Sequence, residues 1–208
     1  MKVFLVRHGS TLYTSQGRLQ GTIDVPLSSD GRKEAELLAS RLSTFSFNAI
    51  YCSNLQRARE TAAAIAQPHN LEPIVLPYLR EYYWGPLQGL TRDEIAKYYP
   101  CAEPGFKKGV MQSVVGGEPI RYLIGRVRLL YHFLMNKAQD NRDSNLIVVS
   151  HGRLLHYFLI YALGFSLKGP RPFVISPASL SILEKKSLSA SFRLLLLNDT
   201  CHLECHTW

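Results

Sequence analysis

The chain has 208 residues, of which 46% are hydrophobic and 19% are charged, and its net charge is +8. This length suits one domain with a substantial core, and no apolar run approaches the length of a membrane span. The basic residues are dispersed and no nucleic-acid-binding motif is present, so we assign the charge to background and a cationic pocket. The first apolar run has only four residues before Arg7, which is too short for a signal peptide, and we expect a cytoplasmic protein.

Strand-like and helix-like segments alternate along the chain. Apolar runs of strand length occur at 3–6, 48–51, 73–76, 145–150, 178–183 and 192–197. Helical spacing follows Ser28 or Ser29, Ser53 and Thr91, and it recurs over 120–138 and around 154–159. The alternation indicates a three-layer α/β/α sandwich with a mostly parallel central sheet, in which the last strand pair can include an antiparallel member. We expect a single domain over 1–208 with an irregular, cap-like excursion at about 82–118.

Two of the predicted strands end in the same dipeptide. Residues 3–9 read Val-Phe-Leu-Val-Arg-His-Gly, and residues 145–152 read Asn-Leu-Ile-Val-Val-Ser-His-Gly. Because open α/β sheets bind ligands at the carboxyl ends of their strands, His8 and His151 are expected side by side at one sheet edge. The alternative is two unrelated structural histidines.

Two further residues extend this candidate site. Arg57 follows the strand at 48–51 and is predicted in the first turn of a helix, where an anion is favoured; Arg7 and Arg57 then grip one phosphate from two sides. Glu81 precedes three aromatic residues, and partial desolvation there would raise its pKa and suit it to proton transfer. The alternatives are a surface helix arginine and a solvated loop glutamate.

The motifs resemble those of the histidine phosphatase (phosphoglycerate-mutase-like) superfamily over nearly the whole chain. The matching segments are Arg7-His8-Gly9, 17–21, 24–27, 53–61, 79–89 and Ser150-His151-Gly152, and the tail 198–203 is similar to that of the phosphatase branch.

The resemblance implies a phosphoric monoester hydrolase that acts on small phosphorylated metabolites. It implies that a neutral His8 attacks the phosphoryl group and becomes a phosphohistidine, with its other ring nitrogen donating to a backbone carbonyl. Arg7, Arg57 and His151 would hold the phosphoryl oxygens, and Glu81 would protonate the leaving oxygen. No cofactor and no metal are expected. The implied substrate contacts are Ser10, Thr14, Gln20, Gly21, Arg59, Tyr82, Tyr83, Trp84 and Gly152.

Three positions depart from the family pattern. Ser10 stands where the family often has Glu, Thr14 where it often has Asn, and Leu87-Gln88-Gly89 where it usually has Trp-Glu-Gly. The changes at Ser10 and Thr14 remove no core catalytic role but bear on specificity and efficiency, and the change at Leu87-Gln88-Gly89 alters the local charge.

Two other functions compete with hydrolysis. A cofactor-dependent phosphoglycerate mutase is the closer alternative. The resemblance implies that mutases of this family are longer and carry an added basic segment after the acid, whereas this region is short here and its basic residues are Lys107 and Lys108. A non-catalytic module that binds a phosphorylated ligand is the other, and it would not need His8 and Glu81.

The remaining features suggest little further chemistry. Four cysteines are expected to be reduced, and the tail from Cys201 to His206 lacks a second cluster to complete a zinc site. The expected partner is a small phosphorylated metabolite, with no nucleic acid and no membrane. The chain is expected to be a monomer, or a homodimer paired through an edge strand such as 73–76.

Overall fold

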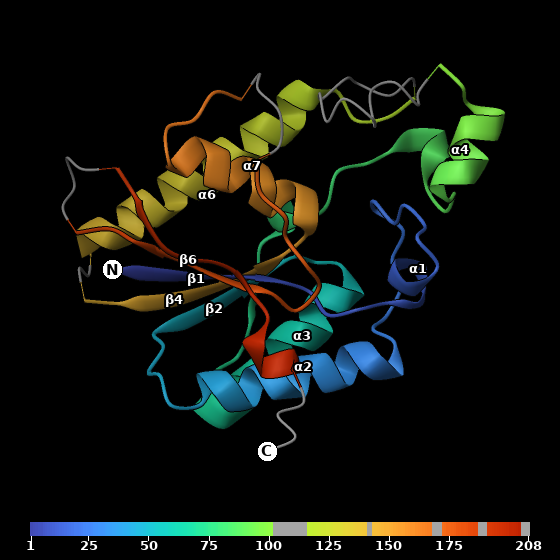
Figure 1. The fold of residues 1–208 in the computed structure, drawn as a ribbon. Helices are drawn as coiled ribbons and strands as arrows, with labels where there is room; N and C mark the ends of the chain where they lie inside the picture. The colour runs from blue at the N-terminus through green and yellow to red at the C-terminus, as the bar shows by residue number, and fades with distance from the viewer. Residues whose placement is uncertain (102–115, 141–142, 168–171, 187–190, 205–208) are drawn as a thin grey trace.

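The computed structural model describes residues 1–101, 116–140, 143–167, 172–186 and 191–204 (Figure 1). Within these residues, six strands form one sheet: β1 (Lys2–Arg7), β2 (Ala49–Cys52), β3 (Ile74–Val75), β4 (Asn145–Ser150), β5 (Leu180–Glu184) and β6 (Arg193–Asp199). The helices are α1 (Leu12–Ser15), α2 (Ser29–Leu42), α3 (Gln56–Ala66), α4 (Arg92–Tyr98), α6 (Ile120–Asp140) and α7 (Gly152–Ala162). The described part of the chain also contains the 3₁₀ turns η1 (Gln67–His69), η2 (Pro77–Leu79), η3 (Gly85–Leu87) and η4 (Cys201–Leu203).

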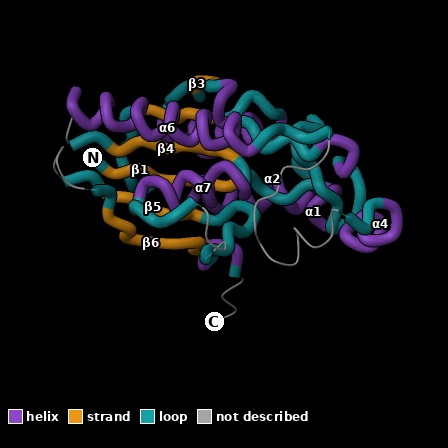
Figure 2. Tube along the Cα trace, turned by 90° about the horizontal axis from the view of Figure 1, so that it is seen from above, coloured by secondary structure: helices purple, strands orange, loops and turns teal. Residues whose placement is uncertain are grey.

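The strand order is β3-β2-β4-β1-β5-β6, with β3 and β6 at the two edges (Figure 2). β1, β4, β2 and β3 pair in parallel, whereas β5 lies antiparallel to both β1 and β6. The predicted mostly parallel sheet with an antiparallel member among the last strands is therefore confirmed. The carboxyl ends of β1, β2 and β4 face the end of the molecule where α1 and α4 lie (Figure 1).

Helices cover both faces of the sheet: α6 and α7 lie on one side, and α2 and α3 lie on the other (Figure 1). The alternation of side chains along β1 supplies both layers, since Val3 and Leu5 pack in the first core while Phe4 and Val6 pack in the second. A strand buried on both faces must be apolar throughout, which explains the uninterrupted apolar run at 3–6.

Local sequence signals set some of the helix starts. Ser28 caps α2 by accepting a hydrogen bond from the Gly31 amide, and Thr91 and Glu94 form a reciprocal capping box on α4. The predicted cap at Ser53 is wrong, because the N-cap of α3 is Leu55, which makes no side-chain capping bond. The amide of Gln56 instead donates to Asp24 at 2.6 Å, so a carboxylate from another loop serves the first turn of α3.

Within the described residues, no helix is long and apolar enough to cross a membrane. The described cysteines Cys52, Cys101 and Cys201 are free thiols. No group of His, Cys, Asp and Glu able to hold a metal ion occurs in the same ranges, while Cys205 and His206 of the tail motif lie outside them.

Candidate active site

The parallel pairing of β1 with β4 places the two histidines together. Arg7 is in register with Ser150, and the His8 amide continues the ladder by donating to the Ser150 carbonyl at 3.0 Å. His8 and His151 follow directly, and their ring centroids lie 5.0 Å apart. The predicted paired-histidine arrangement is confirmed, and both side chains are buried.

His8 is held in one tautomer. Its Nδ1 lies 2.7 Å from the carbonyl oxygen of Gly9, which can only accept, so the Nδ1 proton is donated there. The proton-free Nε2 then accepts a hydrogen bond from Nε of Arg57 at 3.2 Å. Burial, together with the charges of Arg57 and Arg7, holds the pKa of His8 well below its ordinary value. His8 is therefore a neutral imidazole with a nucleophilic Nε2 at neutral pH.

Arg57 lies at the start of α3, as predicted, and its side chain is fully buried. Its two terminal nitrogens donate to the backbone carbonyls of Ile23 at 2.8 Å and Gly21 at 2.7 Å. None of the ion pairs among the described residues includes it, and burial lowers its pKa to about 10. A buried guanidinium without an anionic partner is prepared to receive an anion.

Beside Arg57 and His8, two buried nitrogen atoms have no hydrogen-bond partner among the described residues. They are Nε of Arg7 and Nδ1 of His151, and both are buried. Arg7 uses Nη1 to donate to the Ile175 carbonyl at 2.6 Å, and Nε2 of His151 lies 2.8 Å from the hydroxyl of Ser53. A buried hydrogen-bonding group left without a partner costs free energy, so a bound oxyanion at this site would satisfy groups that the protein leaves open.

Glu81 lies beside this cluster. Its carboxylate accepts from the backbone amides of Tyr82 at 2.8 Å and Arg153 at 3.1 Å. Arg153 belongs to the first turn of α7, the helix that begins immediately after His151. The predicted proton-transfer residue is therefore partly buried and adjoins the second histidine.

The loop after His8 holds the other predicted contacts. Ser10 does not point freely into the site, because its amide and hydroxyl both donate to the carboxylate of Glu34 on α2, each at 2.7 Å. The side-chain amide of Gln20 donates through Nε2 to the Thr14 hydroxyl at 2.9 Å. Gly21 contributes the carbonyl that anchors Arg57.

Two glycines allow α2 to approach this loop. A Cβ at Gly31 would lie 1.9 Å from the Ser10 carbonyl oxygen, and a Cβ at Gly9 would lie 2.5 Å from the Gly31 carbonyl oxygen. At the far side of the site, the Gly152 backbone lies against the Arg7 guanidinium, since a Cβ there would be 3.4 Å from Nε.

The aromatic run after Glu81 differs from the prediction. Tyr82 is fully buried and Trp84 is nearly so; their rings pack edge to face, 5.0 Å apart, beneath the Arg153 guanidinium. Tyr82 also donates its hydroxyl to the Glu118 carbonyl at 2.5 Å. These two side chains belong to the core, and only Tyr83 is exposed, with 40% of its surface accessible.

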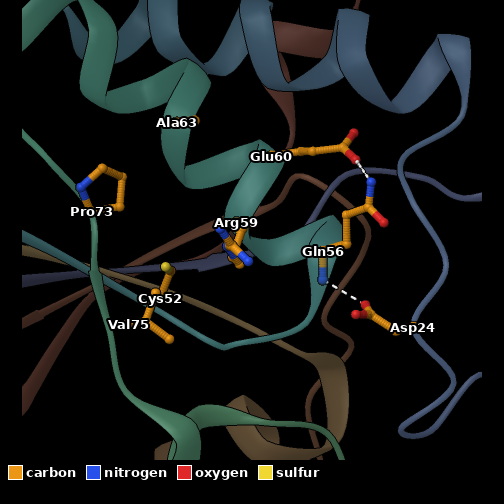
Figure 3. A pocket seen from close by; sticks show the side chains of 8 residues that line it. All are labelled: Asp24, Cys52, Gln56, Arg59, Glu60, Ala63, Pro73 and Val75. Carbon is orange, nitrogen blue, oxygen red and sulfur yellow. Dashed lines mark hydrogen bonds between the residues drawn. The ribbon is translucent and has the colours of Figure 1, made fainter.

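Arg59 also departs from its predicted place at the substrate. Residues two apart on a helix project to opposite sides, so Arg59 points away from the Arg57 side of α3. It lines a separate cleft of about 530 Å³ with Asp24, Gln56, Glu60, Pro73 and other residues (Figure 3). No described hydrogen bond or ion pair joins it to His8 or His151.

Several residues of the site were missed in the sequence. Ser53 pairs with His151, and its position just after β2 was the available signal. Thr61 lies one turn after Arg57 on α3, where its hydroxyl accepts from the Gly9 amide at 3.1 Å and donates to the Arg57 carbonyl at 2.8 Å. Glu34 gives no local signal, because it looks like any polar residue on a helix.

Comparison with known proteins bears on this geometry. The model of the histidine phosphatase superfamily (branch 1) matches residues 3–200. Phosphoserine phosphatase 1 of Hydrogenobacter thermophilus is 32% identical over 98% of this chain and 94% of its own length. A probable phosphoglycerate mutase of Yersinia pestis is 30% identical over 98% of this chain and 95% of its own. The solved structure of a mycobacterial glucosyl-3-phosphoglycerate phosphatase with VO3 has a TM-score of 0.85 at 27% identity, covering 95% of this chain and 98% of that one.

Proposed function

Because this chain belongs to the histidine phosphatase superfamily, we propose that it hydrolyses phosphomonoesters of small metabolites through a phosphohistidine on His8. One observation carries the proposal. A neutral, buried histidine stands beside an arginine without a carboxylate partner, and two further buried nitrogens of the cluster are open to an oxyanion. The relatives that are named phosphatases agree with it.

In the first step, Nε2 of His8 attacks phosphorus while the bond to the ester oxygen breaks. The incoming phosphoryl group replaces the contact between Nε2 and Arg57, whose guanidinium then binds a phosphoryl oxygen. Arg7, Arg57 and His151 stabilise the charge on these oxygens, and the Nδ1 proton stays with the Gly9 carbonyl. Glu81 gives its proton to the leaving oxygen, and an alcohol departs.

In the second step, a water molecule attacks the phosphohistidine in line with the P–N bond. Glu81, now a carboxylate, accepts a proton from this water, and the bond between phosphorus and Nε2 breaks. Inorganic phosphate leaves, and His8 returns to its neutral state with Glu81 protonated. The two arginines offset the phosphoryl charge in both steps, so we propose that the enzyme needs no metal ion.

We assign recognition beyond the phosphate to Thr14, Gln20 and Gly21 in the loop after His8, and to Tyr83 and Gly152, while Ser10 is held by Glu34. We also propose that residues 1–208 act as one catalytic domain whose excursion at about 82–118 forms a wall of the pocket; residues 102–115 lie outside the described ranges. A cytoplasmic location and a monomer or homodimer complete the proposal.

The test is hydrolysis of p-nitrophenyl phosphate with and without a chelator. We expect turnover that survives the chelator and a loss in kcat/KM of at least about 10³-fold in His8→Ala. His132→Ala is the matched control, since His132 is an exposed histidine on α6. Undiminished turnover in His8→Ala would show that the nucleophile is another group.

A phosphoglycerate mutase is the second candidate, because relatives with that name match 98% of this chain. Its test is incubation with 3-phosphoglycerate and a trace of 2,3-bisphosphoglycerate. Rapid appearance of 2-phosphoglycerate would favour the mutase, whereas release of inorganic phosphate would favour the hydrolase. The basic pair Lys107-Lys108, on which the sequence comparison with mutases rested, lies outside the described residues.

A further inference from the structure

The segment that carries Glu81 has no regular secondary structure. Residues 80–84 connect η2 to η3, so neither a strand ladder nor a helix supplies partners for their backbone groups. Buried backbone groups nevertheless need partners, and the position of the Glu81 side chain depends on what holds this backbone. The side chains that form hydrogen bonds with this backbone come from a distant part of the chain.

Arg126, on α6, provides the first set of contacts. Its guanidinium donates to three carbonyls of the segment before and at the acid: Tyr78 and Glu81, each at 3.4 Å, and Arg80 at a shorter distance. These donors come from one rigid planar group, so the three carbonyls are fixed relative to one another and to the helix.

Glu118 provides the second set, on the other side of Glu81. Its carboxylate accepts from the Tyr83 amide at 3.2 Å, its own amide donates to the Tyr83 carbonyl at 2.8 Å, and its carbonyl accepts from the Tyr82 hydroxyl. The backbone that carries the acid is therefore bound on both sides.

These two residues also bind each other. Nη2 of Arg126 lies 2.8 and 2.9 Å from the two carboxylate oxygens of Glu118, and Nε lies 3.2 Å from one of them. The Arg126 side chain is 11% exposed and that of Glu118 is 7% exposed. A buried ion pair adds little net stability compared with an apolar pair of similar size. Unlike an apolar pair, however, this ion pair also forms hydrogen bonds with the backbone of the segment that carries Glu81.

We propose that Arg126 and Glu118 are positioning residues that hold Glu81 at the distance and angle needed to protonate the leaving group. The inference rests on the proposed function of Glu81. The Glu81 carboxylate accepts only two described hydrogen bonds, from the amides of Tyr82 and Arg153. Its position therefore depends on the backbone segment that carries Glu81. A displacement of about 1 Å at a reacting group can reduce the rate about 10²-fold.

The test compares leaving groups. p-Nitrophenolate departs readily without a proton, whereas phenolate and the alkoxide of glycerol 2-phosphate need one increasingly. We measure kcat/KM, which reports phosphoryl transfer to the enzyme, for these three phosphates with wild type, Arg126→Lys and Glu118→Gln. We expect hydrolysis of glycerol 2-phosphate to fall about 10²-fold, the lower end of what general acid catalysis contributes, and that of p-nitrophenyl phosphate to fall less than about threefold.

Three controls separate positioning from stability. The double variant Arg126→Met/Glu118→Leu removes both charges together and is expected to fold while giving the same steep dependence on the leaving group. Arg128→Met, an exposed arginine on the same helix, is expected to behave as wild type. Circular dichroism and thermal melting establish that each variant is folded at the assay temperature.

Glu81→Gln is the reference, and it must itself become more sensitive to the leaving group. If it does, and the Arg126 and Glu118 variants lose activity equally on all three substrates, the positioning role is overturned while the proposed function stands. If Glu81→Gln shows no added sensitivity, the assignment of the acid fails and the positioning role fails with it.

Discussion

Gly31→Ala is predicted to disturb the nucleophile loop from a position outside it. The added Cβ would lie 1.9 Å from the Ser10 carbonyl oxygen and 2.8 Å from the Ser10 carbonyl carbon. Both neighbours are backbone atoms, so α2 and the loop must move apart by more than 1 Å. Ser10 is two residues from His8, and we expect the displacement to reach the site.

The magnitude follows from three contributions. Overpacking typically costs about 1–3 kcal/mol. The Ser10 carbonyl accepts hydrogen bonds from the amide of Ser28 at 3.0 Å and its hydroxyl at 3.2 Å, and losing both costs about 1 kcal/mol each. Replacing a helical glycine with alanine returns about 1 kcal/mol. The net expected loss in the free energy of unfolding is about 2–4 kcal/mol.

Urea unfolding and kcat/KM for p-nitrophenyl phosphate measure the two effects. Gly125→Ala on α6 is the matched control, because its added Cβ meets no atom within 4 Å and should stabilise the protein by about 0.8–1 kcal/mol. We expect Gly31→Ala to lower kcat/KM at least about tenfold. Equal stabilities and unchanged activity in the two variants would refute the reasoning.

Three further predictions follow from the electrostatics and caps of the molecule. The pKa values of His8 and His151 are held well below their ordinary value, chiefly by burial. Below pH 6.5 the unfolded chain binds protons that the folded protein does not, so the free energy of unfolding should decrease as the pH is lowered, by up to about 1.4 kcal/mol per pH unit for each histidine. Urea unfolding in phosphate-free buffer at pH 5.5–7.5 should show a weaker dependence of this free energy on pH in His8→Gln than in the wild type. An unchanged dependence would contradict this. Inorganic phosphate at about 100 times its Kd should raise the free energy of unfolding by about 2.7 kcal/mol, and at that concentration Arg57→Gln should gain less than half as much. Thr91→Ala should lose about 1 kcal/mol through the α4 capping box, and an unchanged urea midpoint would exclude that contribution.

The strand ends were the part of the site that the sequence predicted best. A short apolar run followed by Arg7-His8 or by Ser150-His151 fixes both the strand and the point at which it stops, and parallel pairing then places the residues together. Arg57 was predicted by the same reasoning, because a helix that directly follows β2 must begin at that edge. The helix faces also followed from periodicity, since Ala35, Leu38 and Leu42 are buried as their spacing indicates.

Contacts between distant segments were not predictable in this way. Glu34 and Ser10, or Arg126 and Glu81, meet only because α2 and α6 pack on the sheet, and no local pattern records which polar residue of a helix faces a loop. The aromatic run failed for a related reason, since a segment without periodicity does not reveal which side chains turn inward. Arg59 is different: its spacing from Arg57 contained the signal that the two point apart.

The central place of β1 in the sheet has a consequence for synthesis. Residues 2–7 are made well before their pairing partners, which are residues 145–150 and 180–184. At a translation rate of about 5–20 residues per second, residue 145 follows residue 7 after about 7–28 seconds, so this apolar segment has no neighbouring strand for at least that time. The strand that places the nucleophile is thus made long before the strands that pair with it, and it remains unpaired during that interval.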